Sequence, residues 1–98
     1  VILAVSEEEI PDRALAAQAA DALLNIIGVR ASVVAFRQGE DTIVSARSLG
    51  QINVQIIMEK LGGGCHHTMA GAQIKGLEME KVKQMLLESI DQYFQEKS

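Results

Sequence analysis

Aromatic side chains are scarce in this 98-residue sequence, which has two Phe, one Tyr and no Trp. Because 48% of the residues are nevertheless hydrophobic, the core must be built from aliphatic side chains. No run of about 18 or more apolar residues occurs, which excludes a membrane-spanning helix within this sequence. The single Cys excludes an internal disulfide and fits a reducing compartment.

Positive charge is also in short supply. Nine Lys and Arg residues against 13 Asp and Glu residues give a formal net charge of -4. This balance disfavours a domain that binds long nucleic acids by bulk electrostatics, because such domains are usually basic. It leaves room for one or two phosphates held by a local Arg. The length suits a single domain, and Val1 opens a strand-like run without a Met or a leader. We therefore expect residues 1–98 to be one domain of a longer protein.

Hydrophobic periodicity predicts a small α/β domain in the order strand, helix, strand, strand, helix, strand, helix. Strands are expected at residues 1–5, 31–37, 42–48 and 71–75, and helices at residues 13–27, 54–61 and 78–97. Asp12 and Asn53 are the expected N-caps, and Gly28 and Gly62 the expected helix ends. Residues 6–9 are expected to be a solvated acidic connector. The predicted architecture is a mixed β-sheet of about four strands with helices packed on it.

The most unusual stretch is residues 62–71, GGGCHHTMAG. Each glycine in regular structure costs about 0.5–1 kcal/mol relative to Ala, so a run of three needs a reason. Such a run is tolerated where the chain adopts a positive φ or where something approaches the backbone closely. The amides of Gly63 and Gly64 could form an anion-binding nest. A helix C-cap followed by a sharp turn is the alternative, although one glycine would be enough for that.

A second candidate lies at the end of the third predicted strand. Strand alternation places Ser45 and Arg47 on one face of the sheet and Ser48 on the other. The planar guanidinium of Arg fits phosphate or carboxylate oxygens two at a time, and the Ser hydroxyls add neutral donors. The alternative is an exposed Arg at a strand end that binds nothing.

The only Cys and the only His residues of the sequence are Cys65, His66 and His67. Adjacent residues rarely chelate one ion together, and structural zinc sites use spaced pairs and four ligands. In an extended chain the two His side chains would point in different directions, and His66 could hydrogen-bond a phosphate or a base edge. Cys65 is a poor candidate for a nucleophile, because no third group is identifiable that would orient a base. We predict no catalytic and no metal-binding residue, and a substrate-binding set of Ser45, Arg47, Ser48, Gly63, Gly64 and His66.

These motifs resemble the DHHA1 domain, which is the C-terminal half of DHH-family phosphoesterases. The matching stretches are residues 45–48 (SARS), 52–54 (INV) and 63–71 (GGCHHTMAG). They are most similar to one subgroup, the bacterial membrane-anchored cyclic-di-AMP phosphodiesterases. Cys65 replaces the family's glycine before the His, and Met69 replaces its first Ala. If that glycine needs a positive φ, Cys65 would add strain of about 1–2 kcal/mol.

The resemblance implies a division of labour with a preceding DHH domain, which would hold two manganese ions and perform hydrolysis. Arg47 would bind a phosphate, while His66 and the backbone of Gly63 and Gly64 would contact the phosphate or nucleobase across the cleft between the domains. The domain alone would carry no cofactor and would be inactive. It would lie in the cytoplasm without direct membrane contact, as part of a parent protein anchored in the bacterial cell membrane. Its expected partners are the nucleotide, the DHH domain and, as a further alternative, a second copy of the chain.

Two other functions stay open. Oligoribonucleases and single-strand exonucleases of the same family share the Gly-Gly-Gly-His motif, so the domain could serve a linear substrate. A structural or dimerisation module without ligand contacts would fit the aliphatic composition and the strongly apolar last helix. Binding of tRNA, as in relatives of alanyl-tRNA synthetase, lacks the support of a basic patch.

Overall fold

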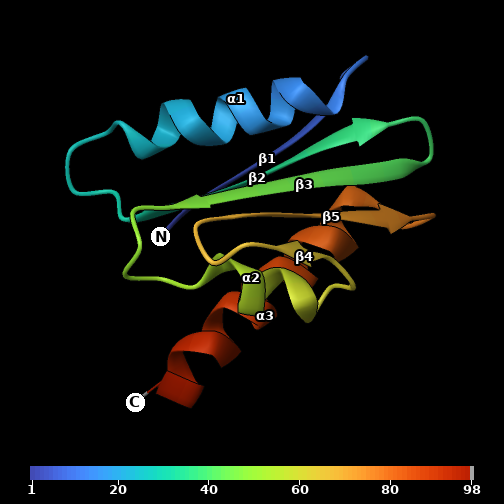
Figure 1. The fold of residues 1–98 in the computed structure, drawn as a ribbon. Helices are drawn as coiled ribbons and strands as arrows, with labels where there is room; N and C mark the ends of the chain where they lie inside the picture. Colours follow the sequence, from blue (N-terminus) through green and yellow to red (C-terminus); the bar gives the residue numbers. More distant parts are fainter. Residues whose placement is uncertain (98) are drawn as a thin grey trace.

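The computed structural model describes residues 1–97, which form three layers with a mixed β-sheet in the middle (Figure 1). Its strands are β1 (Ile2–Glu9), β2 (Ala31–Gln38), β3 (Asp41–Ser48), β4 (Gly64–Cys65) and β5 (Met69–Lys75). The helices are α1 (Arg13–Leu24), which covers one face, and α2 (Val54–Glu59) and α3 (Met79–Lys97), which cover the other. The predicted α/β class is confirmed, with one short strand, β4, more than expected.

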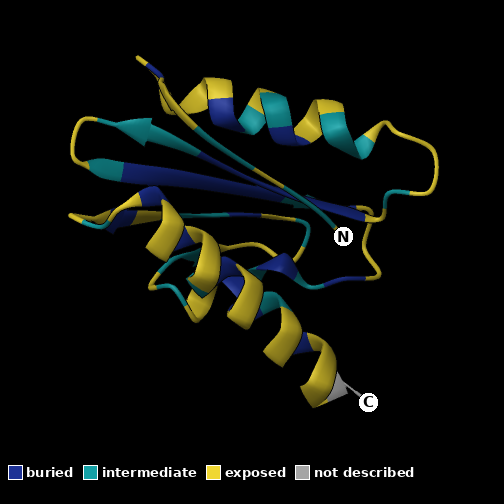
Figure 2. Ribbon diagram, turned by 180° about the vertical axis from the view of Figure 1, so that it is seen from behind, coloured by how far each residue is buried: buried dark blue, intermediate teal, exposed yellow. Residues whose placement is uncertain are grey.

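The strand order in the sheet is β1-β2-β3-β5-β4. β1 and β2 are parallel and are joined through α1, whereas every other neighbouring pair is antiparallel. The expected hairpin of β2 and β3 is present, and its register places Gln38 opposite Asp41 around a two-residue turn. β3 therefore lies in the middle of the sheet, and both of its faces are shielded along most of its length (Figure 2).

Strand alternation divides the core into two parts. The larger part lies between the sheet and the pair α2 and α3, and includes Val33, Val44, Ile57 and Leu86. The smaller part lies under α1 and consists of the buried residues Ile10, Ala16, Ala20, Val34 and Ile43.

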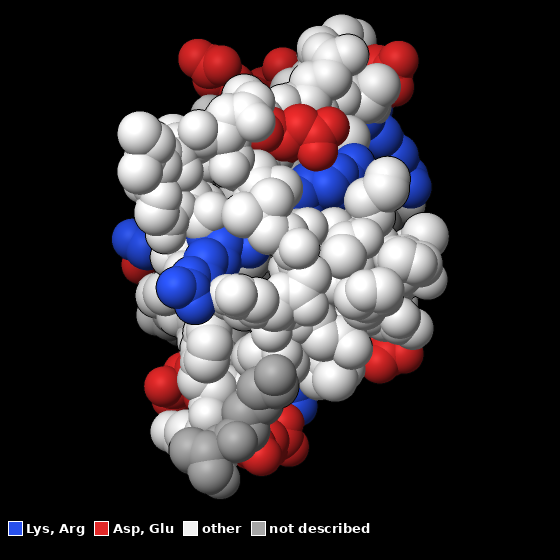
Figure 3. All heavy atoms as spheres, turned by 60° about the vertical axis from the view of Figure 1, so that its left-hand side comes forward, with Lys and Arg blue, Asp and Glu red and all other residues white. Residues whose placement is uncertain are grey.

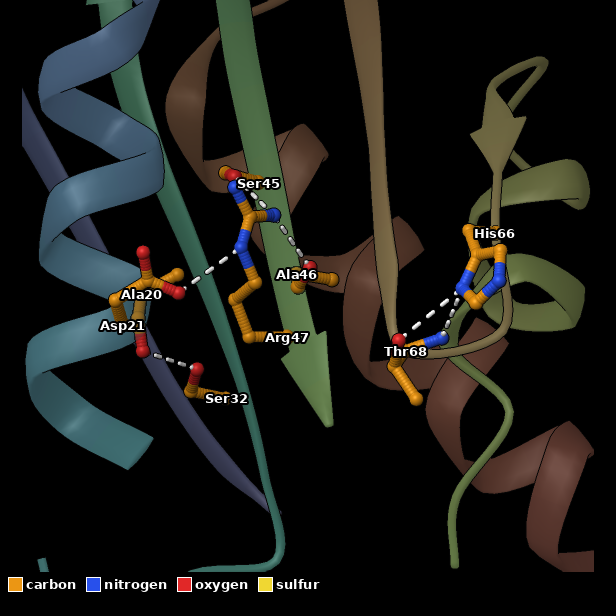
Figure 4. A network of polar contacts seen from close by, with 8 residues as sticks. All are labelled: Ala20, Asp21, Ser32, Ser45, Ala46, Arg47, His66 and Thr68. Atoms are coloured by element: carbon orange, nitrogen blue, oxygen red, sulfur yellow. Dashed lines mark hydrogen bonds and ion pairs between the residues drawn. The ribbon is translucent and has the colours of Figure 1, made fainter. Parts of the chain in front are cut away.

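The buried stripe of α1 is small, because Ala16 and Ala20 face the sheet. Their short side chains allow the close approach that lets the Ser32 hydroxyl donate to the Ala20 carbonyl at 2.6 Å (Figure 4). Two larger apolar residues of this region, Leu15 and Ile26, are 42% and 49% exposed. The larger side chains lie at the margin because the alanines set the helix-to-sheet distance.

Two predicted boundaries were also wrong. Residues 6–9 continue β1 instead of forming a connector, with an irregular register between Val5 and Glu9. An edge strand can carry acidic side chains because one of its sides faces water, and the two oxygens of the Glu9 carboxylate share the N–H of Gly39. α1 ends at Leu24, three residues earlier than expected, with Asn25 as its C-cap.

The predicted N-caps are confirmed. The Asp12 carboxylate accepts from the Ala14 amide at 2.9 Å, and the Asn53 side chain accepts from the Ile56 amide at 3.3 Å. α3 is linked to the α2 region by two further bonds. The Tyr93 hydroxyl accepts from the Asn53 amide at 2.8 Å, and the Ser89 hydroxyl donates to the Ile57 carbonyl at 2.8 Å.

Candidate functional site

A groove of about 760 Å³ opens on the α1 face of the sheet. It exists because α1 packs on β2 and β3 and leaves β5 and β4 uncovered on that side. The first turns of α1 form one wall, β3 and β5 form the floor, and β4 forms the other wall. The lining residues are Arg13, Ala14, Ala17, Ile43, Val44, Ser45, Arg47, Gly63, Gly64, Cys65, Met69, Ala70, Gly71, Ala72 and Gln73.

Arg47 lies on the floor of the groove, between β3 and α1 (Figure 4). Its side chain is only 14% exposed, and its Nη1 donates to the Ser45 hydroxyl at 3.2 Å and to the Ala46 carbonyl at 2.8 Å. Its Nε lies 3.0 Å from Oδ1 of Asp21 on α1. This contact is an ion pair without hydrogen-bond geometry, so Nε is the one buried side-chain nitrogen or oxygen of the described chain without a hydrogen-bond partner.

The floor beside Arg47 is formed by residues with very small side chains. The register pairs Ser45 with Gly71, and Gly71 with Gly64, so these three residues form a row across β3, β5 and β4. A Cβ on Gly71 would lie 2.9 Å from the Val44 carbonyl oxygen. Strand pairing itself therefore requires a glycine here, and the row leaves space above the backbone for a ligand.

The three glycines at the α2–β4 junction each have a structural reason. The Gly62 amide donates to the Glu59 carbonyl and the Gly63 amide to the Met58 carbonyl, which is the Schellman pattern of a helix end, and Gly62 has φ +85°. A Cβ on Gly63 would lie 2.1 Å from the Gly71 carbonyl oxygen, so this glycine allows β5 to come close. Gly64 has φ +145°. The run is thus explained without a ligand, which removes the argument that three glycines favour function.

Cys65 is free of the backbone strain that we considered for it. No residue other than glycine has a positive φ within residues 1–97. The positive φ falls on Gly64, one position earlier, and Cys65 pairs with Ala70 as an ordinary strand residue. Its thiol is free and exposed at the margin of the groove.

His66 and His67 lie in the turn between β4 and β5 and do not line the groove. The His66 amide donates to the Met69 carbonyl, and the His66 carbonyl accepts from the Met69 amide, which closes the turn. The ring centroids of His66 and His67 lie 4.5 Å apart. Their expected divergence is therefore wrong. The Thr68 amide donates to His66 Nδ1 at 3.4 Å, and the Thr68 hydroxyl lies 3.1 Å from the same nitrogen. Figure 4 shows His66 beyond β5, well separated from Arg47.

The structure brings four of the six predicted binding residues together, namely Ser45, Arg47, Gly63 and Gly64. His66 lies at the neighbouring turn, and Ser48 lies on the opposite face of β3. The Ser48 hydroxyl accepts from the Gly50 amide at 3.0 Å, so it stabilises the turn after the strand. The alternation predicted for Ser45, Arg47 and Ser48 is confirmed.

Sequence reasoning missed a second guanidinium in the groove. Arg13 is the first residue of α1, and its Nη2 donates to the Gln73 side-chain carbonyl on β5. The Gln73 amide in turn donates to the Asp41 carboxylate at 2.7 Å. The local signal was the position of Arg13 after the N-cap Asp12, but only the packing of α1 shows that it faces β5.

A family model described as the DHHA1 domain matches residues 1–96. The chain belongs to the DHHA1 family. This DHHA1 domain is 49% identical over 90 residues to the cyclic-di-AMP phosphodiesterase GdpP of Geobacillus thermodenitrificans, a match that covers 91% of the chain and 14% of that protein. It is 35% identical over 85 residues to the bifunctional oligoribonuclease and PAP phosphatase NrnA of Thermus thermophilus, covering 83% of the chain and 26% of that protein.

Solved structures show the same fold. An exopolyphosphatase-related protein from Bacteroides fragilis superposes with a TM-score of 0.72 at 18% identity, covering 91% of this chain and 28% of that one. The DHHA1 domain therefore spans a minor part of its relatives, which are larger phosphoesterases.

Within residues 1–97, the DHHA1 domain has no group of three or more His, Cys, Asp or Glu side chains placed to hold a metal ion. None of the helices described is long and apolar enough to cross a bilayer. On the face shown in Figure 3, Lys and Arg side chains form small separate patches, some of them beside Asp or Glu side chains. The groove itself is lined by two arginines, Arg13 and Arg47, and by no acidic side chain among the described residues.

Proposed function

We propose that this DHHA1 domain holds the nucleotide phosphate for a DHH-family phosphodiesterase that acts on cyclic-di-AMP. The observation that carries the proposal is the largely buried Arg47 on a floor of Ser45, Gly64 and Gly71. The 49% identity to a cyclic-di-AMP phosphodiesterase supports the substrate class. The 35% identity to an oligoribonuclease favours a short linear oligonucleotide as the second candidate.

The role of Arg47 in this proposal is to bind and orient. Nη1 is held by Ser45 and by the Ala46 carbonyl, and Asp21 lies beside Nε. Nη2 makes no hydrogen bond to any described residue, so one arm of the guanidinium is free to donate to a phosphate oxygen. A phosphate bound there would be fixed relative to the sheet, while hydrolysis takes place on the DHH domain.

Manganese does not fit the residues described here, because no suitable cluster of ligands is present among them. We place it in the DHH domain of the parent enzyme, where it would supply the activated water for hydrolysis. The isolated DHHA1 domain should accordingly hydrolyse nothing.

The parent protein would be anchored in the cell membrane by segments outside residues 1–98, which membrane fractionation of its host would test.

The decisive experiment compares Arg47→Ala and Arg47→Lys with the unmodified parent enzyme. Loss of a charged hydrogen-bond donor should cost about 1.5–3 kcal/mol of substrate binding, which is about a 10- to 150-fold increase in KM. Arg47→Lys keeps the positive charge but loses the planar pair of donors, so its KM should lie between those of Arg47→Ala and the unmodified enzyme. Turnover of cyclic-di-AMP should be compared with that of short linear oligoadenylates.

An Arg47→Ala enzyme with unchanged KM and kcat would refute the proposal. Arg30→Ala is the matched control, since Arg30 is exposed and donates to Gln51 at 2.7 Å outside the groove. Faster turnover of linear oligoadenylates than of cyclic-di-AMP would move the assignment to the oligoribonuclease class.

A further inference from the structure

The groove has an unusual charge composition for an acidic chain. The formal net charge is -4, yet the only charged side chains among the described lining residues are Arg13 and Arg47. Two carboxylates are linked to these cations. Asp21 pairs with Arg47, and Asp41 accepts from Gln73, which itself accepts from Arg13. An anion in the groove would therefore meet two guanidinium groups.

The two arginines are anchored at opposite ends of the groove. Arg13, Ala17 and Asp21 lie on one stripe of α1, four residues apart, and the rise per residue places Arg13 about 12 Å from Asp21, the partner of Arg47. The sheet gives a shorter value for the guanidinium groups themselves. Arg13 reaches Gln73, which pairs with Ile43, whereas Arg47 Nη1 is held at Ser45, which lies about 7 Å along β3 from Ile43.

Each guanidinium is thus held by its own partners at a separate point of the groove. A ligand with two separated anionic groups can contact both arginines without displacing these partners. The space between them is bordered by the small residues Ala17, Ser45 and Gly71, so a sugar or base can lie there. Arg13 is exposed, and its Nε and Nη1 make no hydrogen bond to any described residue.

We propose that Arg13 is a second phosphate contact, through which the groove binds nucleotides with two phosphates better than mononucleotides. This inference rests on the proposed function of the groove and adds the residue that sets the length of the ligand. Arg47 would hold the first phosphate in every case. Arg13 would contribute only when a second phosphate reaches the Gln73 end.

The test uses the parent enzyme with Arg13→Ala, Arg47→Ala and Arg30→Ala. Two quantities are measured for each variant. One is KM for the dinucleotide that the enzyme turns over, either cyclic-di-AMP or 5′-phosphorylated linear diadenylate, which both carry two phosphates. The other is the inhibition constant Ki of AMP, which carries one phosphate. Thermal unfolding of each variant confirms that the fold is intact, and Arg13→Lys serves as the conservative variant.

We expect Arg13→Ala to raise KM for the dinucleotide about tenfold or more, as for a lost charged hydrogen bond, and to leave Ki of AMP within about twofold. Arg13→Lys should recover part of the loss, and Arg30→Ala should change neither quantity. Equal effects of Arg13→Ala on KM and Ki, or an effect matched by Arg30→Ala, would overturn the inference. If Arg47→Ala raises both quantities while Arg13→Ala raises neither, the inference fails alone. If neither variant changes either quantity, the proposed function fails as well.

Discussion

The guanidinium of Arg47 has a different environment at each of its three nitrogens. Nε is buried beside Asp21, Nη1 donates to Ser45 and to the Ala46 carbonyl, and Nη2 has no partner among the described residues. The Asp21 side chain is 62% exposed, so the ion pair itself contributes at most about 1 kcal/mol. Its main effect is on orientation, since it holds the plane of the guanidinium with Nη2 free.

The first prediction concerns this orienting carboxylate. In the parent enzyme, Asp21→Ala should raise KM by no more than about fivefold, the equivalent of 1 kcal/mol, and Asp21→Glu should restore part of the loss. Steady-state kinetics at fixed salt measure both. Glu88→Ala is the control, because it removes the same charge from an exposed position on α3. A lower KM for Asp21→Ala would mean that Asp21 competes with the ligand for Arg47.

A second prediction separates the roles of adjacent glycines. A Cβ on Gly63 would meet the Gly71 carbonyl at 2.1 Å, and backbone cannot move aside. Gly63→Ala should therefore lower the free energy of unfolding by about 2–3 kcal/mol. A Cβ on Gly62 would have no neighbour within 4 Å, so the only strain in Gly62→Ala comes from the φ of +85°. This substitution should lower the free energy of unfolding by about 1–2 kcal/mol. Urea unfolding of both variants checks this, and equal losses would contradict the role of Gly63 in strand approach.

At the scale of elements, the link between α2 and α3 depends on few polar contacts. The Tyr93 side chain is 2% exposed, and its hydroxyl accepts from the Asn53 amide just before α2. Tyr93→Phe removes this acceptor and leaves the amide without it, which should lower the free energy of unfolding by about 1–3 kcal/mol. Gln92→Ala, at an exposed position of the same helix, should change it by less than about 0.5 kcal/mol. Equal unfolding midpoints for the two variants would show that the bond contributes little.

The elements that sequence reasoning predicted well are those with a strong local signal. Asp12 and Asn53 are caps whose side chains bond to nearby amides, and the hairpin of β2 and β3 follows from alternation and a polar turn. β4 was missed because its two residues, Gly64 and Cys65, carry no period. Its pairing is decided by β5, a long-range contact that no local pattern records.

The residues of the candidate site also differ in whether a local pattern predicts their position. Arg47 could be placed on the correct face of the sheet because strand alternation has a period of two. Arg13 could not, because its position depends on how α1 docks. The small side chains of Ala16 and Ala20 set that docking, and their burial is a property of the packed helix and sheet. The position of His66 likewise depends on a turn that closes only when β4 pairs with β5.

For the whole molecule, the unequal covering of the sheet is the central feature. The pair α2 and α3 covers one face, whereas α1 covers only the β2 and β3 part of the other. An uncovered half of a sheet exposes backbone and small side chains to a ligand or to another domain. The chain spans 14% of the length of the GdpP protein of Geobacillus thermodenitrificans, so most of that relative lies outside the matched part.

The last prediction tests the whole domain against a purely structural or dimerising role. Amide chemical shifts of the 98-residue chain should change on titration with cyclic-di-AMP at Arg47, Gly64 and Gly71, with smaller changes at His66, which lies outside the groove. Binding should be weak if, as in the proposed function, the substrate also contacts the DHH domain of the parent enzyme. The same titration of Arg47→Ala should show most of these changes lost, while Arg30→Ala should show them unchanged. Shifts that depend on protein concentration alone and fall on exposed α3 positions, such as Leu87 and Phe94, would instead indicate self-association. That outcome would assign the apolar last helix, and not the groove, to the function of the domain.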